Sequence, residues 1–163
     1  MRISILHVAR LIAVALTAAL MTACTSTESK KSEVIRETDV LFKAYLEADV
    51  PHARQTLEQM IQLFRSQRAQ ALGASYQAHS LFCAYARLYV LEKRTGNLDN
   101  AEAALVRARY WQLESYVSSE DGWKNRVSLR ELLSHNKSDN IVEIVEKLDK
   151  PANGGKGPKY AQQ

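Results

Sequence analysis

The stretch Leu81–Arg109 constrains the fold most, because two amphipathic helix patterns meet in it at one short break. Apolar or small residues recur at helical spacing on both sides of that break, namely Tyr85, Leu88 and Leu91 before it and Leu98, Ala101, Leu105 and Ala108 after it. The break is Thr95-Gly96-Asn97, where glycine suits the positive φ of a helix C-terminus, and Lys93 and Arg94 stand where cations favour the helix dipole. The stretch therefore predicts a helical hairpin whose alanines allow close packing, and we expect the rest of the chain to stack on it.

Three motifs in this hairpin follow the consensus of one repeat family. They are Tyr85-x2-Leu88 in the first helix, Gly96-Asn97-Leu98 in the turn and Ala101-x3-Leu105-x2-Ala108 in the second helix. With these motifs the hairpin resembles a tetratricopeptide repeat, a helix–turn–helix unit of about 34 residues. Tyr89 and Glu92 depart from the family pattern, and a fainter copy, Ala53-x3-Leu57-x2-Met60, lies upstream. The resemblance implies that antiparallel helical hairpins stack as a short array, and with the helix patterns along the rest of the chain it predicts an all-α fold of about six helices.

Residues 1–24 have the organisation of a targeting segment. Two arginines precede an apolar run, Leu11–Met21, that is shorter than the roughly 20 residues a membrane-spanning helix needs. The segment ends in Leu20-Met21-Thr22-Ala23-Cys24, which resembles the lipobox of bacterial lipoproteins. That resemblance implies cleavage before Cys24, acylation of its thiol and anchoring in the cell envelope, at the outer membrane because Thr25 rather than aspartate follows. An ordinary secretory signal with a coincidental cysteine is the alternative.

The composition divides the chain into four parts. They are a signal peptide over 1–23, the lipidated cysteine with a flexible tether over 24–31, a helical domain over 32–149 and a disordered tail, rich in glycine, proline and lysine, over 150–163. The signal peptide carries two arginines, so its removal lowers the formal net charge of +4 by two. The basic composition of the whole chain is therefore no reason to expect a nucleic-acid partner.

Helix and break patterns predict the order of elements before the hairpin. Ser32 is expected to cap a first helix, whose inner face is formed by Val34, Leu41, Tyr45 and Ala48. Asp49-Val50-Pro51 ends that helix and begins a second one, because proline is favoured in a first helical turn. The buried stripe of this second helix is formed by Ala53, Leu57, Met60, Ile61 and Phe64. A turn within Ala71–Ser75 is then expected to separate it from the hairpin.

Two further helices are expected after the hairpin. Ser118–Gly122 is typical of a loop, and a short helix follows from Trp123 to Asn136. Ser138 or Asp139 is expected to cap the last helix, whose apolar face is formed by Ile141, Ile144, Val145 and Leu148.

Few residues stand in an arrangement that would carry chemistry. His52, His79 and His135 belong to no HExxH, ExxH or CxxC motif, so we expect no metal or cofactor. His79 and Cys83 lie one helical turn apart and could form a nucleophile pair, but their apolar helical stripe favours a cysteine that is a small buried hydrophobe. Because the envelope is oxidising, an intermolecular disulfide is a further option for Cys83. The sequence predicts no enzyme.

Stacked helical hairpins leave a concave surface that is lined by the first helix of each unit. The repeat resemblance implies that the side chains facing this surface are Phe42 and Tyr45 upstream and Cys83, Ala86, Val90 and Lys93 in the hairpin. Phe42 lies off the apolar stripe, which fits either an exposed contact or a core in a different register. Lys93 suits an acidic group on a partner, or else a solvated helix end.

These features predict a non-enzymatic envelope lipoprotein that acts as a protein-binding scaffold or assembly adaptor and is anchored to the membrane through Cys24. The alternative is a periplasmic inhibitor or immunity lipoprotein that blocks one enzyme. The adaptor would join a larger envelope complex, whereas the inhibitor would have one tight, soluble partner. A short array buries little core, so a homodimer is a further option, and an apolar end face without an intramolecular neighbour would indicate it.

Overall fold

The structure, a computed structural model, describes residues 27–119, 138–150 and 157–162. In these residues the chain forms helices and no strand, so the predicted all-α class is confirmed. The elements are a first helix over 27–47, α2 (Val50–Arg65), η1 (Gln67–Leu72), α3 (Ala74–Arg94), α4 (Leu98–Val117), α7 (Ser138–Leu148) and η2 (Lys159–Gln162). Three predictions lie outside the described residues: the signal peptide, the lipidation of Cys24 and the short helix that begins at Trp123.

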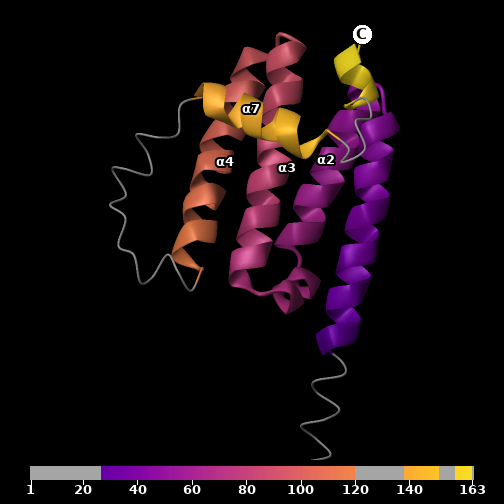
Figure 1. Cartoon of the computed structure of the whole chain (residues 1–163), viewed down its shortest axis with the longest axis vertical. Helices are drawn as coiled ribbons and strands as arrows, with labels where there is room; N and C mark the ends of the chain where they lie inside the picture. The colour runs from indigo at the N-terminus through magenta and orange to yellow at the C-terminus, as the bar shows by residue number, and fades with distance from the viewer. Residues whose placement is uncertain (1–26, 120–137, 151–156, 163) are drawn as a thin grey trace, which may run out of the picture.

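The four long helices lie side by side and alternate in direction (Figure 1). α3 is the central helix, and it packs against α2, α4, α7 and η1. α7 crosses α3 near the α3–α4 turn, where Arg94 donates to Glu146 at 3.1 Å (Figure 1). η2 lies beside the end of the first helix, far from α4 (Figure 1).

The hairpin of α3 and α4 forms as the sequence predicts. Ala101, Ala104 and Ala108 are at most 3% exposed where α4 meets α3, so small side chains allow the two helices to approach closely. In α2 the whole predicted stripe is buried, namely Ala53, Leu57, Met60, Ile61 and Phe64. Leu98 was predicted on the inner face of the hairpin but is 68% exposed, because it begins α4 beyond the contact with α3.

Local sequence chemistry sets the helix boundaries. Asp49 caps α2 by accepting a hydrogen bond from the backbone N–H of His52 at 3.1 Å. Gly73 and Gly96 have φ values of 84° and 77°, a conformation that other residues rarely adopt, and they separate η1 from α3 and α3 from α4. The predicted turn within residues 71–75 is therefore confirmed.

Two predictions at the chain ends are wrong. Residues 27–31 are helical, so Ser32 lies inside the first helix rather than at its N-cap, and this part of the predicted tether is ordered. The tail over 150–163 is not wholly disordered, because Pro158 and Tyr160 are buried and η2 forms. The content of glycine, proline and lysine led to the prediction of a disordered tail. The buried side chains of Pro158 and Tyr160 nevertheless provide enough apolar surface for the end of the chain to pack against the helices.

Candidate functional site

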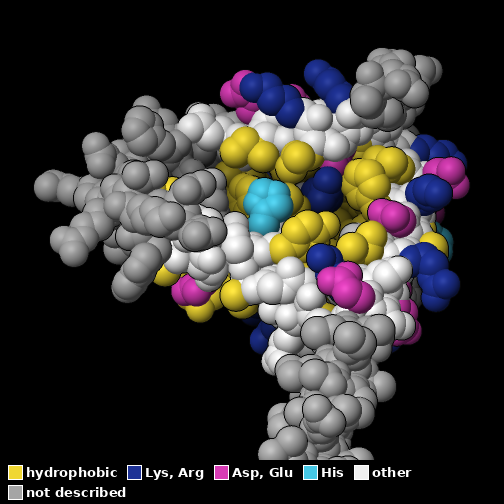
Figure 2. Space-filling view, turned by 60° about the horizontal axis from the view of Figure 1, so that its bottom comes forward, with side chains coloured by type: hydrophobic (Ala, Val, Ile, Leu, Met, Phe, Trp, Pro, Cys, Tyr) yellow, Lys and Arg dark blue, Asp and Glu magenta, His cyan; other side chains and the backbone are white. Residues whose placement is uncertain are grey.

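A groove of about 460 Å³ opens between the first helix and α3, with α2 as its floor. Its apolar lining is Phe42 from the first helix, Met60 and Phe64 from α2, Tyr76, Cys83 and Ala84 from α3, and Leu148 from α7. Its polar lining is Thr38, Asp39, His79, Ser80 and Arg87. Figure 2 shows a hollow in which hydrophobic side chains surround a histidine and a basic side chain.

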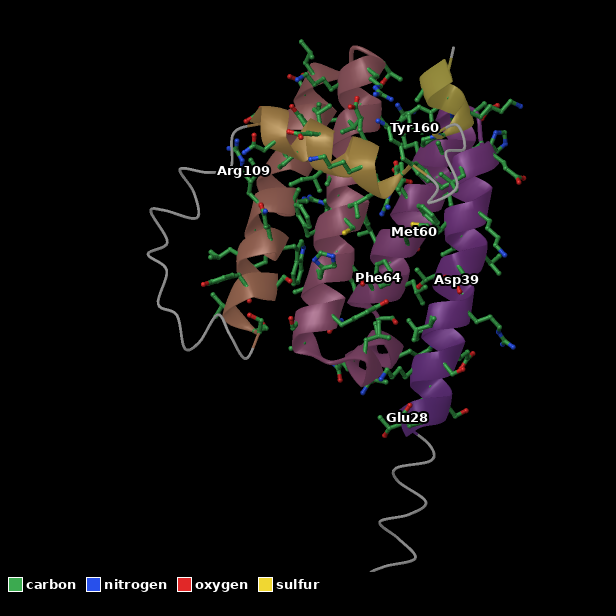
Figure 3. All side chains as sticks on the ribbon, viewed as in Figure 1. Glu28, Asp39, Met60, Phe64, Arg109 and Tyr160 are labelled. Carbon is green, nitrogen blue, oxygen red and sulfur yellow. The ribbon has the colours of Figure 1, made fainter. Side chains whose placement is uncertain are left out.

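The residues on the floor of the groove are buried, whereas side chains on its walls are exposed. Met60 and Phe64 are only 2% and 4% exposed, and Figure 3 shows them on α2, beside the first helix that carries Asp39. By contrast, Tyr76 is 55% exposed and Leu148 is 43% exposed on the walls. Exposed aromatic and aliphatic side chains around a concave surface are typical of a binding site.

A second, more open hollow of about 590 Å³ continues the groove toward the start of α3. Tyr76 and His79 line both hollows, so the two form one surface. Three serines, Ser75, Ser115 and Ser118, line the second hollow. Ser75 and Ser115 each donate to the backbone carbonyl of the other, at 3.2 and 3.5 Å, and so join α3 to α4 there. The surface therefore offers apolar contacts at one end and polar contacts at the other.

Arg87 connects the groove to a buried polar network. Its Nε donates to Asp149 at 2.7 Å, and its guanidinium lies 4.8 Å from the ring centre of Phe42. The second oxygen of Asp149 accepts from the hydroxyl of Tyr45 at 2.8 Å, and that hydroxyl lies 2.7 Å from the hydroxyl of Tyr160. Because Tyr45 donates its one proton to the carboxylate, Tyr160 is the donor to Tyr45.

Burial controls the electrostatics of this network. Desolvation raises the pKa of Tyr45 far above its usual value, and the neighbouring Tyr160 and Asp149 raise it further. Desolvation also raises the pKa of Tyr160. Asp149 is 4% exposed, and it is satisfied by a charged partner and a hydroxyl. The network therefore ties the first helix, α3, the end of α7 and η2 together, and it holds Arg87 against the groove.

The residues predicted to contact a partner lie in three different environments. Phe42 is half-buried on the groove wall, together with Cys83 from the hairpin, so the structure brings these two predicted positions together. Tyr45 and Val90 are 0% and 2% exposed, which leaves them almost no surface to offer a partner. Lys93 is exposed, and its ammonium lies 5.6 Å from the ring centre of Tyr89.

Cys83 and His79 face each other with Sγ and Nε2 3.5 Å apart. Burial raises the pKa of the Cys83 thiol, which disfavours the thiolate that a nucleophile needs. Within the described residues no three side chains of histidine, cysteine, aspartate or glutamate gather closely enough to hold a metal ion. Cys83 is not in a disulfide in this single chain.

A second buried ion pair joins α2 to the α3–α4 turn. Glu92 is 2% exposed, and it accepts from Arg54 through both carboxylate oxygens, with Nη2 to Oε2 at 2.9 Å. The amide of Asn97 also donates to Glu92, at 2.9 Å. Glu92 departs from the repeat consensus. A charged residue on the buried face of a helix needs an oppositely charged side chain beside it, so this departure was the signal in the sequence that could have indicated the ion pair.

Comparisons with known proteins add no identity: no protein-family model, curated protein or solved structure matches the chain. In the part of the chain that the structure describes, no helix has the length and hydrophobicity needed to cross a membrane.

Proposed function

We propose that this chain is a non-enzymatic, lipid-anchored envelope protein that recruits another protein by binding one of its segments in the groove between the first helix and α3. The observation that carries this proposal is the accessible apolar wall of the groove at Tyr76, Phe42 and Leu148. Each apolar side chain that is fully buried there would contribute about 1.5–3 kcal/mol. A partner segment with two or three apolar side chains on one face therefore fits, as in helix-in-groove recognition.

The position of the groove supports a repeat-like interpretation of the fold. In stacked hairpins, the first helices of successive units line the concave face. If the first helix and α2 are one unit and α3 and α4 the next, the two first helices are those that wall the groove. Phe42 and Cys83, which the repeat resemblance places on such a face, both line it.

The proposed lipid anchor would hold this domain close to the membrane. Cys24 precedes the first described helical residue by three positions, and three residues span at most about 11 Å. An acylated Cys24 would therefore leave little room for large movement away from the bilayer surface. Such a geometry suits a partner that is itself in or next to the membrane.

Site-specific photo-crosslinking tests the proposal. We would place benzoylphenylalanine at Tyr76, which is 55% exposed on the groove wall, and at Val40, which is 62% exposed on the first helix but does not line the groove. In cells that express the full chain, we expect one envelope protein to crosslink from position 76 and not from position 40. The same crosslink should weaken when Cys24→Ala prevents anchoring.

Two results would contradict the proposal. Equal products from positions 76 and 40 would show that capture does not depend on the groove. A variant carrying Phe42→Ala that crosslinks from position 76 as well as the unsubstituted chain would show that the groove wall does not select the partner.

A further inference from the structure

The outer face of α4 carries an apolar seam that is separate from the groove. Val106, Tyr110 and Val117 are 59%, 53% and 53% exposed, and Leu113 lies half-buried between the last two. The spacing of these four residues alternates between four, three and four positions, which places them in one line along the helix. This is the spacing of a helix that packs against another helix.

The seam lies on the side of α4 that faces away from α3. Ala101, Ala104, Leu105 and Ala108 form the buried side of the helix, half a turn around from the seam. Among the described elements, α3 is the one that packs extensively on α4. Figure 1 shows α4 at one edge of the array, opposite the first helix. The apolar seam therefore has no partner helix within the described chain.

We propose that the seam binds the same seam of a second copy, with the two α4 helices antiparallel about a two-fold axis. In the register that we infer, Val106 lies opposite Val117 of the second copy, and Tyr110 lies opposite its Leu113. Two-fold symmetry repeats both pairs, which gives four apolar layers and no polar one. A two-fold contact of this kind uses one patch twice and closes at a dimer.

The charges beside the seam select this register. Arg107 and Glu114 lie on the same side of the seam, and in this register each faces the other across the two-fold axis, twice per dimer. A shift by one layer would instead place Arg107 opposite Arg107 of the second copy. The Arg107 guanidinium lies 5.7 Å from the ring centre of Tyr85 on α3, so in the single chain it turns toward α3, and it would leave this contact to pair with Glu114 of the second copy.

The size of the seam sets the expected strength. Four layers over about three helical turns form an interface at the small end of the specific range, so we expect a dissociation constant of roughly tens of micromolar. The inference depends neither on the groove nor on lipid attachment. Its test therefore gives an answer whether or not the adaptor function is correct.

Charge reversal tests both the dimer and its register. We would measure the mass of the full chain by sedimentation equilibrium, under reducing conditions and with micelles in excess over chains, from about 1 to 500 µM. We expect Arg107→Glu and Glu114→Arg each to weaken dimerisation roughly tenfold or more, because each places like charges opposite one another twice. A mixture of these two variants should form a heterodimer, and the doubly reversed chain should dimerise about as well as the original.

These rescues distinguish charge pairing across the seam from an indirect effect of either substitution on α4. Arg107→Glu also removes the contact with Tyr85, but the doubly reversed chain lacks that contact too, so recovery can only come from the restored pairs. Arg36→Glu, an equivalent reversal on the exposed first helix, should leave the mass unchanged. A chain that stays monomeric at every concentration overturns the proposal, and it would indicate that residues 120–137 or a different protein cover the seam. The proposal is also overturned if the chain self-associates and neither Arg107→Glu nor Glu114→Arg weakens that association.

Discussion

The groove and the α4 seam both expose apolar side chains, but they are built in different ways. The groove is concave, draws on four helices and contains Arg87, whose charge is balanced inside the protein by Asp149. The seam is convex, comes from one helix and has opposite charges at equivalent positions along its edge. A surface of the first kind suits a smaller segment of a different protein, whereas a surface of the second kind suits a copy of itself. Substitutions in the groove should therefore disturb the fold as well as binding, and those in the seam should disturb association alone.

The largest expected effect is that of Arg87→Met. The substitution leaves Asp149 buried without its charged partner, so we expect the free energy of unfolding to fall by about 3–5 kcal/mol. Denaturant unfolding followed by circular dichroism would measure it. Arg68→Met removes an ion pair with Glu37 in which both side chains are exposed, and it should have no measurable effect. Equal effects of the two substitutions would show that the network does not anchor the groove.

The next effect concerns the docked tail. Tyr160→Ala removes a buried ring, and we expect it to lower the free energy of unfolding by about 2–4 kcal/mol. Tyr160→Phe keeps the ring and removes the hydroxyl that donates to Tyr45, so it should cost only about 1 kcal/mol. The same denaturation experiment would rank them. If neither substitution changes stability, η2 does not contribute to the fold and the groove does not depend on the tail.

Alkaline pH gives a third and smaller effect. Tyr45 and Tyr160 have pKa values raised above 10 in the folded chain, so between their unfolded and folded pKa values only the unfolded chain releases these protons. The contribution of the two tyrosines to the free energy of unfolding is therefore fully present below pH 10. Above pH 10 the free energy of unfolding falls, by about 1.4 kcal/mol per pH unit for each tyrosine. Unfolding measured from pH 8 to 11 would show the slope. Tyr160→Phe should reduce that slope, and an unchanged slope would mean that Tyr160 ionises freely.

The sequence predicted those parts of the fold that depend on neighbouring residues. The boundaries at Gly73 and Gly96 follow from backbone conformation, and the start of α2 follows from Asp49 and Pro51. Helical spacing was enough to identify the buried stripe of α2. Each of these features is decided within one or two helical turns, and so each can be read from a short stretch of sequence.

The contacts that shape the groove join distant residues, and local patterns do not contain them. Arg87 and Asp149 are 62 positions apart, and Tyr45 and Tyr160 are 115 apart. Helical spacing predicted that Tyr45 lies on an inner face, but it could not predict that the Tyr45 hydroxyl lies beside Asp149. The repeat resemblance brought Phe42 and Cys83 to one surface, yet it placed Val90 there as well. Val90 is buried because α7 crosses α3 close to it, and the consensus includes no such crossing helix.

A matched pair of valine substitutions gives the smallest effect and the sharpest contrast between the two kinds of surface. Val106→Ser alters a side chain that is 59% exposed in the seam, so we expect it to change the free energy of unfolding of the monomer by at most about 0.5 kcal/mol. Val90→Ser makes the same chemical change where the side chain is 2% exposed, and it should cost about 2–3 kcal/mol because it leaves a small cavity and places a hydroxyl in an apolar environment. Denaturation of dilute protein would measure both, and sedimentation would show whether Val106→Ser alone abolishes dimerisation. A large loss of monomer stability in Val106→Ser would mean that α4 packs this face against its own chain, and the seam would then not be available to a second copy.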